Sequence, residues 1–249
     1  MVDFFLLIEM IYDIAGLRIK INNRYRFTTE FCREYLSPDQ VSSADITANA
    51  SDEDIAKEKE CSPNFLDGYI ENICIYRNIC KELPSFSRFL LHAAIMDYSG
   101  IGYAFLGPSG IGKSTHTSLW LKYIPSTRIV NGDKPILHIE NDIIYAYGTP
   151  WMGKEHRGEN SRTVLKALCF LEQAKENSIV RLSRSQTVDR IFHQVLLPEE
   201  ERNAAKTLEL MDKMITLIPA YLLNCDISED AVKLAFETIV QKPYIQKEL

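Results

Sequence analysis

The residues that most clearly bear chemistry form the stretch Gly107–Ser114, Gly-Pro-Ser-Gly-Ile-Gly-Lys-Ser. It fits the pattern Gly-x-x-x-x-Gly-Lys-Ser/Thr, in which the glycines let successive backbone N–H groups converge on phosphate oxygens. In that pattern the lysine, here Lys113, reaches the β and γ phosphates, and the hydroxyl of Ser114 holds Mg²⁺. We therefore predict that this segment, called the phosphate loop below, binds ATP together with Mg²⁺.

The segments on either side of the phosphate loop have the pattern that it requires. Tyr103–Leu106 is a short apolar run that predicts a buried strand and stops at Gly107. A helical pattern begins at Gly112, with Leu119 and Trp120 on its apolar side. The first turn of a helix offers unpaired N–H groups and the positive end of its dipole to an anion. The predicted nucleotide-binding residues of the loop are Gly107, Pro108, Ser109, Gly110, Ile111, Gly112, Lys113, Ser114 and Thr115.

Composition limits the class of protein. The chain has 249 residues, 46% hydrophobic and 25% charged, as in an ordinary globular protein. Its net charge is −6, so we expect no nucleic acid partner, because binding to phosphate backbones depends on basic surfaces. The six cysteines show no Cys-x-x-Cys pair, which favours a reducing cytoplasm. The apolar start, Met1–Met10, is too short to cross a membrane and lacks the basic residues of a signal peptide. We therefore expect a cytoplasmic protein without a membrane partner.

The first third of the chain has its own pattern. Alternating apolar residues in 11–28 predict a hairpin, and Ser51 followed by Asp54 has the form of a capping box that starts a helix ending near Glu60. Residues 64–83 carry apolar and aromatic side chains at helical spacing. We divide the chain into an N-terminal α+β segment, residues 1–84, and a nucleotide-binding core with C-terminal helices, residues 85–249.

Strands outnumber helices around the phosphate loop. Hairpins replace the regular alternation of strand and helix, so the pattern predicts an α/β fold with a mixed sheet and not a doubly wound one. Besides the strand before the loop and a short strand that leads to Asp133, we predict strands at 89–98, 136–140, 142–147, 163–171 and 221–225, and helices at 186–196, 200–218 and 228–241.

Two further places hold residues suited to chemistry. Asp133 follows a short strand, where an acid can take a proton or hold a metal ion, or simply form a turn before Pro135. The segment 148–160, called the 148–160 loop below, is rich in glycine and charge, a composition typical of loops that line sites. Trp151 and Lys154 would line an acceptor pocket there, with ordinary packing as the alternative for the tryptophan.

One class that shares the phosphate loop is excluded. An ABC-type ATPase also needs Leu-Ser-Gly-Gly-Gln, followed by an apolar run that ends in Asp-Glu. The nearest segment, Leu182–Gln186, lacks both glycines, and no such run follows it.

The surroundings of the loop instead resemble the HPr kinase/phosphorylase family and its fold relatives, the phosphoenolpyruvate carboxykinases. In that family a histidine precedes the loop by one strand, as His92 does here. Asn131–Lys134 (Asn-Gly-Asp-Lys) occupies the place of the family's acidic pair, and Glu155–Gly158 (Glu-His-Arg-Gly) is similar to its Glu-x-Arg-Gly segment. The stretch Gly148–Glu155 looks most like a bacterial branch of small HPr-kinase-like proteins. The resemblance covers about residues 85–225.

The resemblance implies a fold and an activity. The fold is the mixed-sheet P-loop core of the HPr kinase/phosphoenolpyruvate carboxykinase type, here with an N-terminal α+β appendage. The activity is that of an ATP- and Mg²⁺-dependent kinase whose acceptor is a hydroxyl, of serine by analogy, on a peptide, protein or small molecule. Asp133, His92 and Lys113 are then the catalytic residues. HPr kinases form rings of subunits, which leaves a homo-oligomer open for this chain.

The resemblance also implies the remaining site residues. Ser114, Asp133 and Glu155 are the expected metal ligands, and Arg157 is expected to contact phosphate. One departure from the family matters: it has two adjacent acids, whereas Asp133 stands between a glycine and a lysine. If Asp133 matches the first acid, the catalytic base is kept. If it matches the second, the base is missing and the chain is a nucleotide-binding regulatory or accessory protein. Both readings stay open, as does the choice between base and metal ligand for Asp133.

Overall fold

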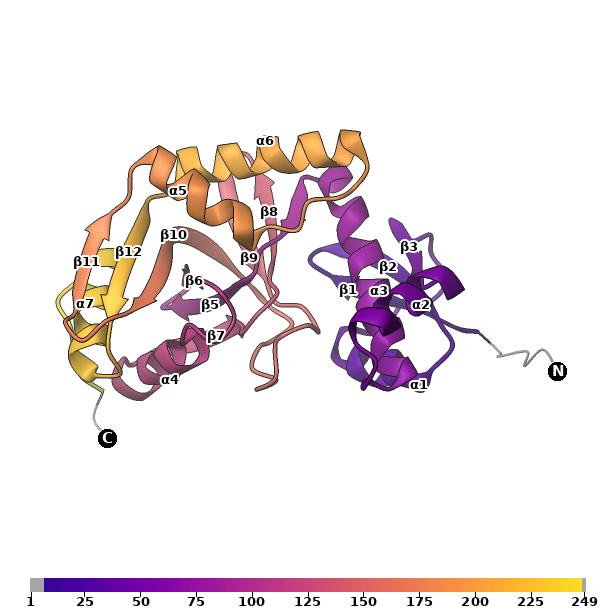
Figure 1. Ribbon diagram of the computed structural model, residues 1–249, viewed down its shortest axis with the longest axis horizontal. Coiled ribbons are helices and arrows are strands. Elements are labelled where there is room, and N and C mark those ends of the chain that lie inside the picture. Colours follow the sequence, from indigo (N-terminus) through magenta and orange to yellow (C-terminus); the bar gives the residue numbers. More distant parts are fainter. Residues whose placement is uncertain (1–6, 248–249) are drawn as a thin grey trace.

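The computed structural model describes residues 7–247. Within that range the chain forms two sheets, one of three strands and one of nine. Figure 1 shows the small sheet with helices α1 to α3 at one end of the molecule and the large sheet with the remaining helices at the other. Most of the apolar start predicted at Met1–Met10 lies outside the described residues. Among the helices of residues 7–247, none is both long and apolar enough to cross a bilayer.

The elements follow the chain in this order. The strands are β1 (Ile8–Ile14), β2 (Leu17–Asn23), β3 (Ile46–Asn49), β4 (Arg88–Leu90), β5 (Ala93–Tyr98), β6 (Ile101–Leu106), β7 (Thr127–Asn131), β8 (Ile136–Glu140), β9 (Ile143–Tyr147), β10 (Arg162–Gln173), β11 (Ser178–Arg181) and β12 (Ala220–Cys225). The α-helices are α1 (Arg26–Phe31), α2 (Asp52–Cys61), α3 (Asp67–Glu82), α4 (Lys113–Tyr123), α5 (Arg184–Ile191), α6 (Glu201–Leu217) and α7 (Glu229–Ile239). The 3-10 helices are η1 (Arg33–Tyr35), η2 (Leu83–Phe86) and η3 (Phe192–Gln194).

The small sheet is built on the predicted hairpin. Strands β1 and β2 pair antiparallel, and β3 joins β2 in parallel. Helix α3 packs on this sheet through fully buried side chains such as Ile75 and Ile79. Helix α2 begins with the capping box of Ser51 and Asp54, as predicted. The sequence pattern did not predict α1 or β3, because β3 buries only Ile46 and Ala48 within a polar stretch.

The large sheet is mixed, as predicted, and it curls around its longest strand. Its path runs β4-β8-β9-β10-β6-β5-β7. The first residues of β10 pair with β9, its middle pairs in parallel with β6, and its last residues pair in parallel with β12. One prediction was wrong: residues 89–98 are not a single strand. The chain leaves the sheet at Leu91 and His92, since β4 pairs with β8 while β5 lies between β6 and β7.

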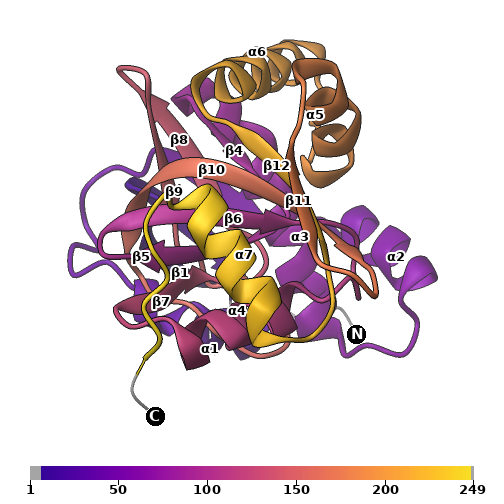
Figure 2. The same ribbon diagram turned by 90° about the vertical axis from the view of Figure 1, so that its left-hand side faces the viewer.

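Helices cover both faces of the large sheet. Helix α6 contributes Met211 and Met214 to a core on one face, where α5 also packs. Helices α4 and α7 cover the other face, where Trp120 and Phe236 lie together with ring centroids 5.8 Å apart. Figures 1 and 2 both show α5 and α6 on the side of the sheet opposite α4 and α7.

Candidate functional site

The phosphate loop joins β6 to α4, as predicted. Gly107 has φ of +142°, and a Cβ on it would lie 3.0 Å from Cγ2 of Ile111, so a larger residue would distort the turn. Residues 108–110 are exposed, whereas the Lys113 side chain is buried. Its Nζ atom donates to the carbonyl of Gly107 at 2.8 Å and to that of Pro108 at 3.3 Å. The Lys113 side chain is therefore folded back onto its own loop.

The other loop residues lie around the first turn of α4. Helix α4 starts after Gly112, whose φ is +112°. Ser114 is half-buried and Thr115 is exposed. The backbone carbonyl of Ser114 accepts a hydrogen bond of 2.6 Å from the hydroxyl of Ser118. Gln173 at the end of β10 donates to the carbonyl of Ile111 at 3.2 Å.

Asn131 fixes the turn that presents Asp133. It is the last residue of β7 and is fully buried. Its Oδ1 atom accepts hydrogen bonds from the backbone N–H of Asp133 at 2.9 Å and of Lys134 at 2.7 Å. Its Nδ2 atom donates to the carbonyl and the hydroxyl of Thr149. The asparagine of the Asn-Gly-Asp-Lys segment thus joins the Asp133 turn to the start of the 148–160 loop.

His92 and Asp133 meet in space. The Nε2 atom of His92 lies 3.1 Å from Oδ1 of Asp133, and the Nζ atom of Lys134 lies 3.2 Å from Oδ2. Burial raises the pKa of the Asp133 carboxyl, but the hydrogen bond from His92 and the charge of Lys134 outweigh it, so the pKa lies below its ordinary value. Asp133 is therefore an ionised carboxylate at neutral pH.

The sheet brings this pair to the phosphate loop. Strand β5 starts directly after His92 and runs antiparallel to both β6 and β7. Its first residue, Ala93, lies opposite Leu106, the last residue of β6, and donates its N–H to the carbonyl of Asp133 at 3.0 Å. Burial lowers the pKa of Lys113, and the Asp133 carboxylate opposes this shift. The structure thus gathers the three predicted catalytic residues at one edge of the sheet.

The 148–160 loop lies against the Asp133 turn. Gly153 has φ of +85°, and a Cβ on it would be 3.1 Å from Cβ of Asp133 and 3.7 Å from Oε2 of Glu155. The exposed carboxylate of Glu155 therefore approaches the same glycine as Asp133. Arg157 donates from Nη1 to the hydroxyl of Ser118 at 2.6 Å, which joins this loop to α4.

The donor atoms near Asp133 suit a hard cation. Mg²⁺ binds in proteins through one or two carboxylates together with hydroxyl, water and phosphate oxygens. Asp133 and Glu155 both lie near the position that a Cβ on Gly153 would occupy, and Ser114 belongs to the phosphate loop. In residues 7–247 no group of three or more His, Cys, Asp or Glu side chains is placed to form a cage by itself. A Mg²⁺ ion at this place would need oxygen ligands besides these side chains.

Trp151 has a different place from the acceptor pocket considered above. Its side chain is buried, its Nε1 atom donates to Oδ1 of Asn72 at 2.9 Å, and its ring centroid lies 4.8 Å from that of Tyr76. Both partners belong to α3. The tryptophan therefore packs the 148–160 loop onto the N-terminal part of the chain, whereas Lys154 is exposed.

The sequence pattern did not indicate one residue that lies at this site. Gln194, at the end of η3, is buried with its side-chain amide beside His92 and Gly107. It lay within the helix predicted at 186–196, and no spacing or motif connects it to the phosphate loop. Only the return of the chain from α5 to the sheet brings it there.

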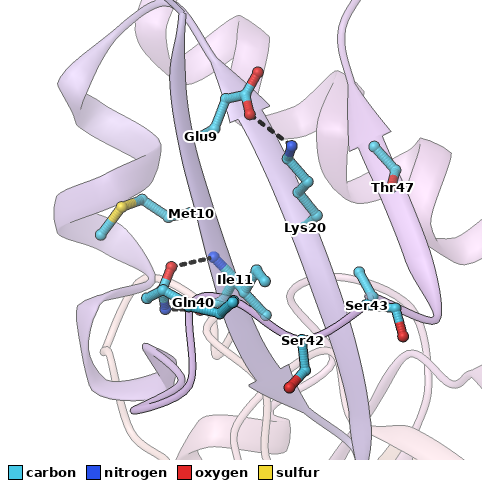
Figure 3. Close-up of a pocket in the computed structure, with 10 residues that line it drawn as sticks. Glu9, Met10, Ile11, Lys20, Gln40, Ser42, Ser43 and Thr47 are labelled. Carbon is cyan, nitrogen blue, oxygen red and sulfur yellow. Dashed lines mark hydrogen bonds and ion pairs between the residues drawn. The ribbon is translucent and has the colours of Figure 1, made fainter.

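A surface pocket of about 310 Å³ lies on the small sheet (Figure 3). Lys20 and Glu9 form an ion pair beside it, and Gln40 hydrogen-bonds the backbone N–H of Ile11 there. None of its lining residues is a predicted site residue. The pocket is separate from the phosphate loop.

Comparisons with known proteins give a distant structural similarity and no match in sequence. No family model and no curated protein matches the sequence. Among solved structures, the chain is similar to the HPr(Ser) kinase/phosphatase from Coxiella burnetii, with 13% sequence identity and a TM-score of 0.34. The similar region covers 61% of this chain and 88% of that one.

Proposed function

We propose that this protein is an ATP- and Mg²⁺-dependent kinase that transfers the γ-phosphate to a hydroxyl group, of serine in a peptide, protein or small molecule. The observation that supports the proposal most directly is the His92–Asp133 pair at the same sheet edge as the phosphate loop and Lys113. The resemblance of the surrounding motifs to HPr kinases gives the same activity.

In the proposed reaction, the chain positions the nucleotide and stabilises charge. The backbone N–H groups of the phosphate loop and of the first turn of α4 bind the phosphates. Lys113 exchanges the carbonyls of Gly107 and Pro108 for the β and γ phosphates. Arg157, already joined to Ser118 beside the first turn of α4, adds a second positive charge near the phosphates.

Asp133 supplies the base. Its carboxylate accepts the proton of the acceptor hydroxyl as the acceptor oxygen bonds to the γ-phosphorus and the bond from that phosphorus to the ADP oxygen breaks. His92 donates from Nε2 to Oδ1 of Asp133 and so orients the carboxylate. A bound Mg²⁺ neutralises charge on the β and γ oxygens, and Ser114 and Glu155 would hold it, with Asp133 as a further ligand.

A second function is favoured by one specific contact. Lys134 occupies the position after Asp133, and its ammonium lies 3.2 Å from the second carboxylate oxygen. A base neutralised in this way is weaker, so the alternative is a nucleotide-binding regulatory or accessory protein that does not transfer phosphate efficiently.

ADP formation from Mg-ATP separates the two functions. We would compare wild type and Asp133→Asn, each with and without desalted host lysate and free serine. Asp142→Asn is the matched control, since Asp142 is exposed and pairs with Lys213. A kinase predicts acceptor-dependent ADP from wild type and the control. It also predicts a loss of at least roughly 100-fold in Asp133→Asn, the size of a general-base contribution.

Binding of a fluorescent ATP analogue completes the experiment. Both functions predict that Asp133→Asn keeps its nucleotide affinity within about threefold, because the phosphate loop makes the main contacts. Full turnover by Asp133→Asn would refute the assignment of the base. Binding by wild type with no turnover under any condition would favour the regulatory protein.

A further inference from the structure

The Gln194 side chain is held in one orientation at the phosphate loop. It is buried, and its amide group faces the carbonyl oxygens of Gly107 and His92. Both are acceptors, so the nitrogen of the amide must point at them. In that orientation the nitrogen lies 3.1 Å from the Gly107 oxygen, 3.2 Å from the His92 oxygen and 3.3 Å from Nδ1 of His92. One amide therefore reaches both the phosphate loop and His92.

The backbone of Gln194 is anchored at the same place. Its carbonyl accepts the N–H of His92 at 2.7 Å. The next residue, Val195, forms an isolated bridge with Leu91. The carbonyl of Gln194 thus holds the backbone N–H of His92. The two N–H groups of the Gln194 amide serve the two nearer acceptors, the carbonyls of Gly107 and His92.

The Gly107 carbonyl has two donors in the structure. Lys113 donates to it at 2.8 Å and the Gln194 amide at 3.1 Å. Gly107 is buried, so a carbonyl that lost both donors would be left without a partner. The proposed function, on which this step rests, moves Lys113 to the phosphates. Gln194 then remains as the donor to the Gly107 carbonyl.

We propose that Gln194 is a positioning residue of this site: it keeps the Gly107 carbonyl paired when Lys113 moves to a phosphate, and it ties that carbonyl to His92. The Nε2 atom of His92 carries a proton, because it faces the Asp133 carboxylate, which only accepts, and Nδ1 of the same ring lies beside the Gln194 amide nitrogen.

The first test needs no nucleotide. Unfolding in urea is measured for wild type, Lys113→Met, Gln194→Leu and the double variant. If the two donors share one carbonyl, either single change leaves it paired and only the double change leaves it unpaired. The double variant should therefore lose more stability than the sum of the single changes. Strictly additive losses would overturn the proposal.

The second test measures the affinity for a fluorescent Mg-ATP analogue. Gln194→Leu should weaken binding roughly fivefold to a hundredfold, the factor that corresponds to leaving a buried carbonyl unpaired once Lys113 departs. In the Lys113→Met background, Gln194→Leu should change the affinity less than about threefold. There the Gly107 carbonyl loses no donor when the nucleotide binds, because the lysine is already absent. A purely structural role would weaken binding equally in both backgrounds, and that result would overturn the proposal.

A matched control comes from Gln173. It also donates to a carbonyl of the phosphate loop, that of Ile111 at 3.2 Å, but it is exposed, so water can replace it. Gln173→Leu should change the affinity less than about threefold. If Gln194→Leu does not fold, Gln194→Met, which is closer in length and equally without a donor, takes its place in both tests.

The two tests separate this proposal from the proposed function. If wild type binds no Mg-ATP, the proposed function fails. The unfolding measurements on the four proteins then still decide the role of Gln194: non-additive losses of stability support the shared carbonyl, and additive losses overturn it. If wild type turns over ATP while the cycle is additive and the affinity of Gln194→Leu is unchanged, the kinase stands and the role of Gln194 is refuted.

Discussion

The indole nitrogen of Trp151 donates a hydrogen bond of 2.9 Å to Oδ1 of Asn72, and both side chains are buried. Trp151 belongs to the loop that carries Glu155 and Arg157, whereas Asn72 lies on α3 in the N-terminal part of the chain. This contact makes α3 a support for the candidate site, although no predicted site residue lies on that helix.

Trp151→Phe tests this support. The phenylalanine keeps a ring against Tyr76 but removes the indole donor, which leaves Oδ1 of Asn72 buried without a partner. We expect the free energy of unfolding to fall by about 1–3 kcal/mol. Urea denaturation measures the change. The double variant with Asn72→Leu should lose less than the sum of the single losses, because it leaves no polar atom unpaired; a loss equal to the sum would contradict the contact.

Gly153→Ala tests whether the position of Asp133 matters for turnover. Gly153 has φ of +85°, and an added Cβ would lie 3.1 Å from Cβ of Asp133. Gly100 is the control, with φ of +86° and nothing within 4 Å of an added Cβ. Both alanine variants should lose roughly 1–2 kcal/mol of stability from the left-handed backbone, measured by thermal unfolding. Only Gly153→Ala should also lower ADP formation. Equal turnover in the two would show that Asp133 tolerates displacement.

Glu155→Gln tests the proposed metal ligand. Loss of one carboxylate charge should raise the Mg²⁺ concentration for half-maximal turnover on the order of tenfold, because the affinity of an oxygen-ligand site depends on its charge. Glu159→Gln is the control from the same loop, since Glu159 pairs with Arg128 at 2.6 Å. An Mg²⁺ titration of ADP formation measures both variants. If the two curves coincide, Glu155 is not a ligand.

The buried side chain of His116 should make the protein less stable in acid. Burial lowers its pKa from 6.5 to about 4, and its Nε2 atom accepts from Nε1 of Trp120 at 3.0 Å. Between these pKa values the unfolded chain binds the proton and the folded protein does not. The free energy of unfolding is therefore unaffected by His116 above pH 6.5. It falls as the pH drops towards 4, by about 3 kcal/mol at most.

His116→Gln checks this prediction. The glutamine keeps an acceptor for Trp120 and does not titrate, so its unfolding free energy should depend less on pH between 6.5 and 4. His193→Gln, at an exposed position, should keep the slope of wild type. Urea denaturation at a series of pH values measures all three proteins. A wild-type slope in His116→Gln would assign the acid sensitivity to other groups.

The features that could be predicted from the sequence are those that depend on residues close together in the chain. The phosphate loop, the capping box of α2 and the mixed character of the large sheet follow from consecutive residues and their spacing. The approach of His92 to Asp133 was expected only through the resemblance to HPr kinases, since it depends on β5 lying between β6 and β7. Gln194 could not be predicted, because a single buried amide has no periodicity and its contacts form only in the folded chain.

Strand β10 has a consequence for synthesis on the ribosome. It pairs with β6 on the side away from β5, yet it is made only after β7, β8 and β9. Because chains emerge from the N-terminus onward, β6 spends that interval as an open edge with unpaired backbone groups. A chain that stops at Tyr147 would therefore present this edge to other chains, so truncation there should yield aggregates and not a smaller nucleotide-binding unit.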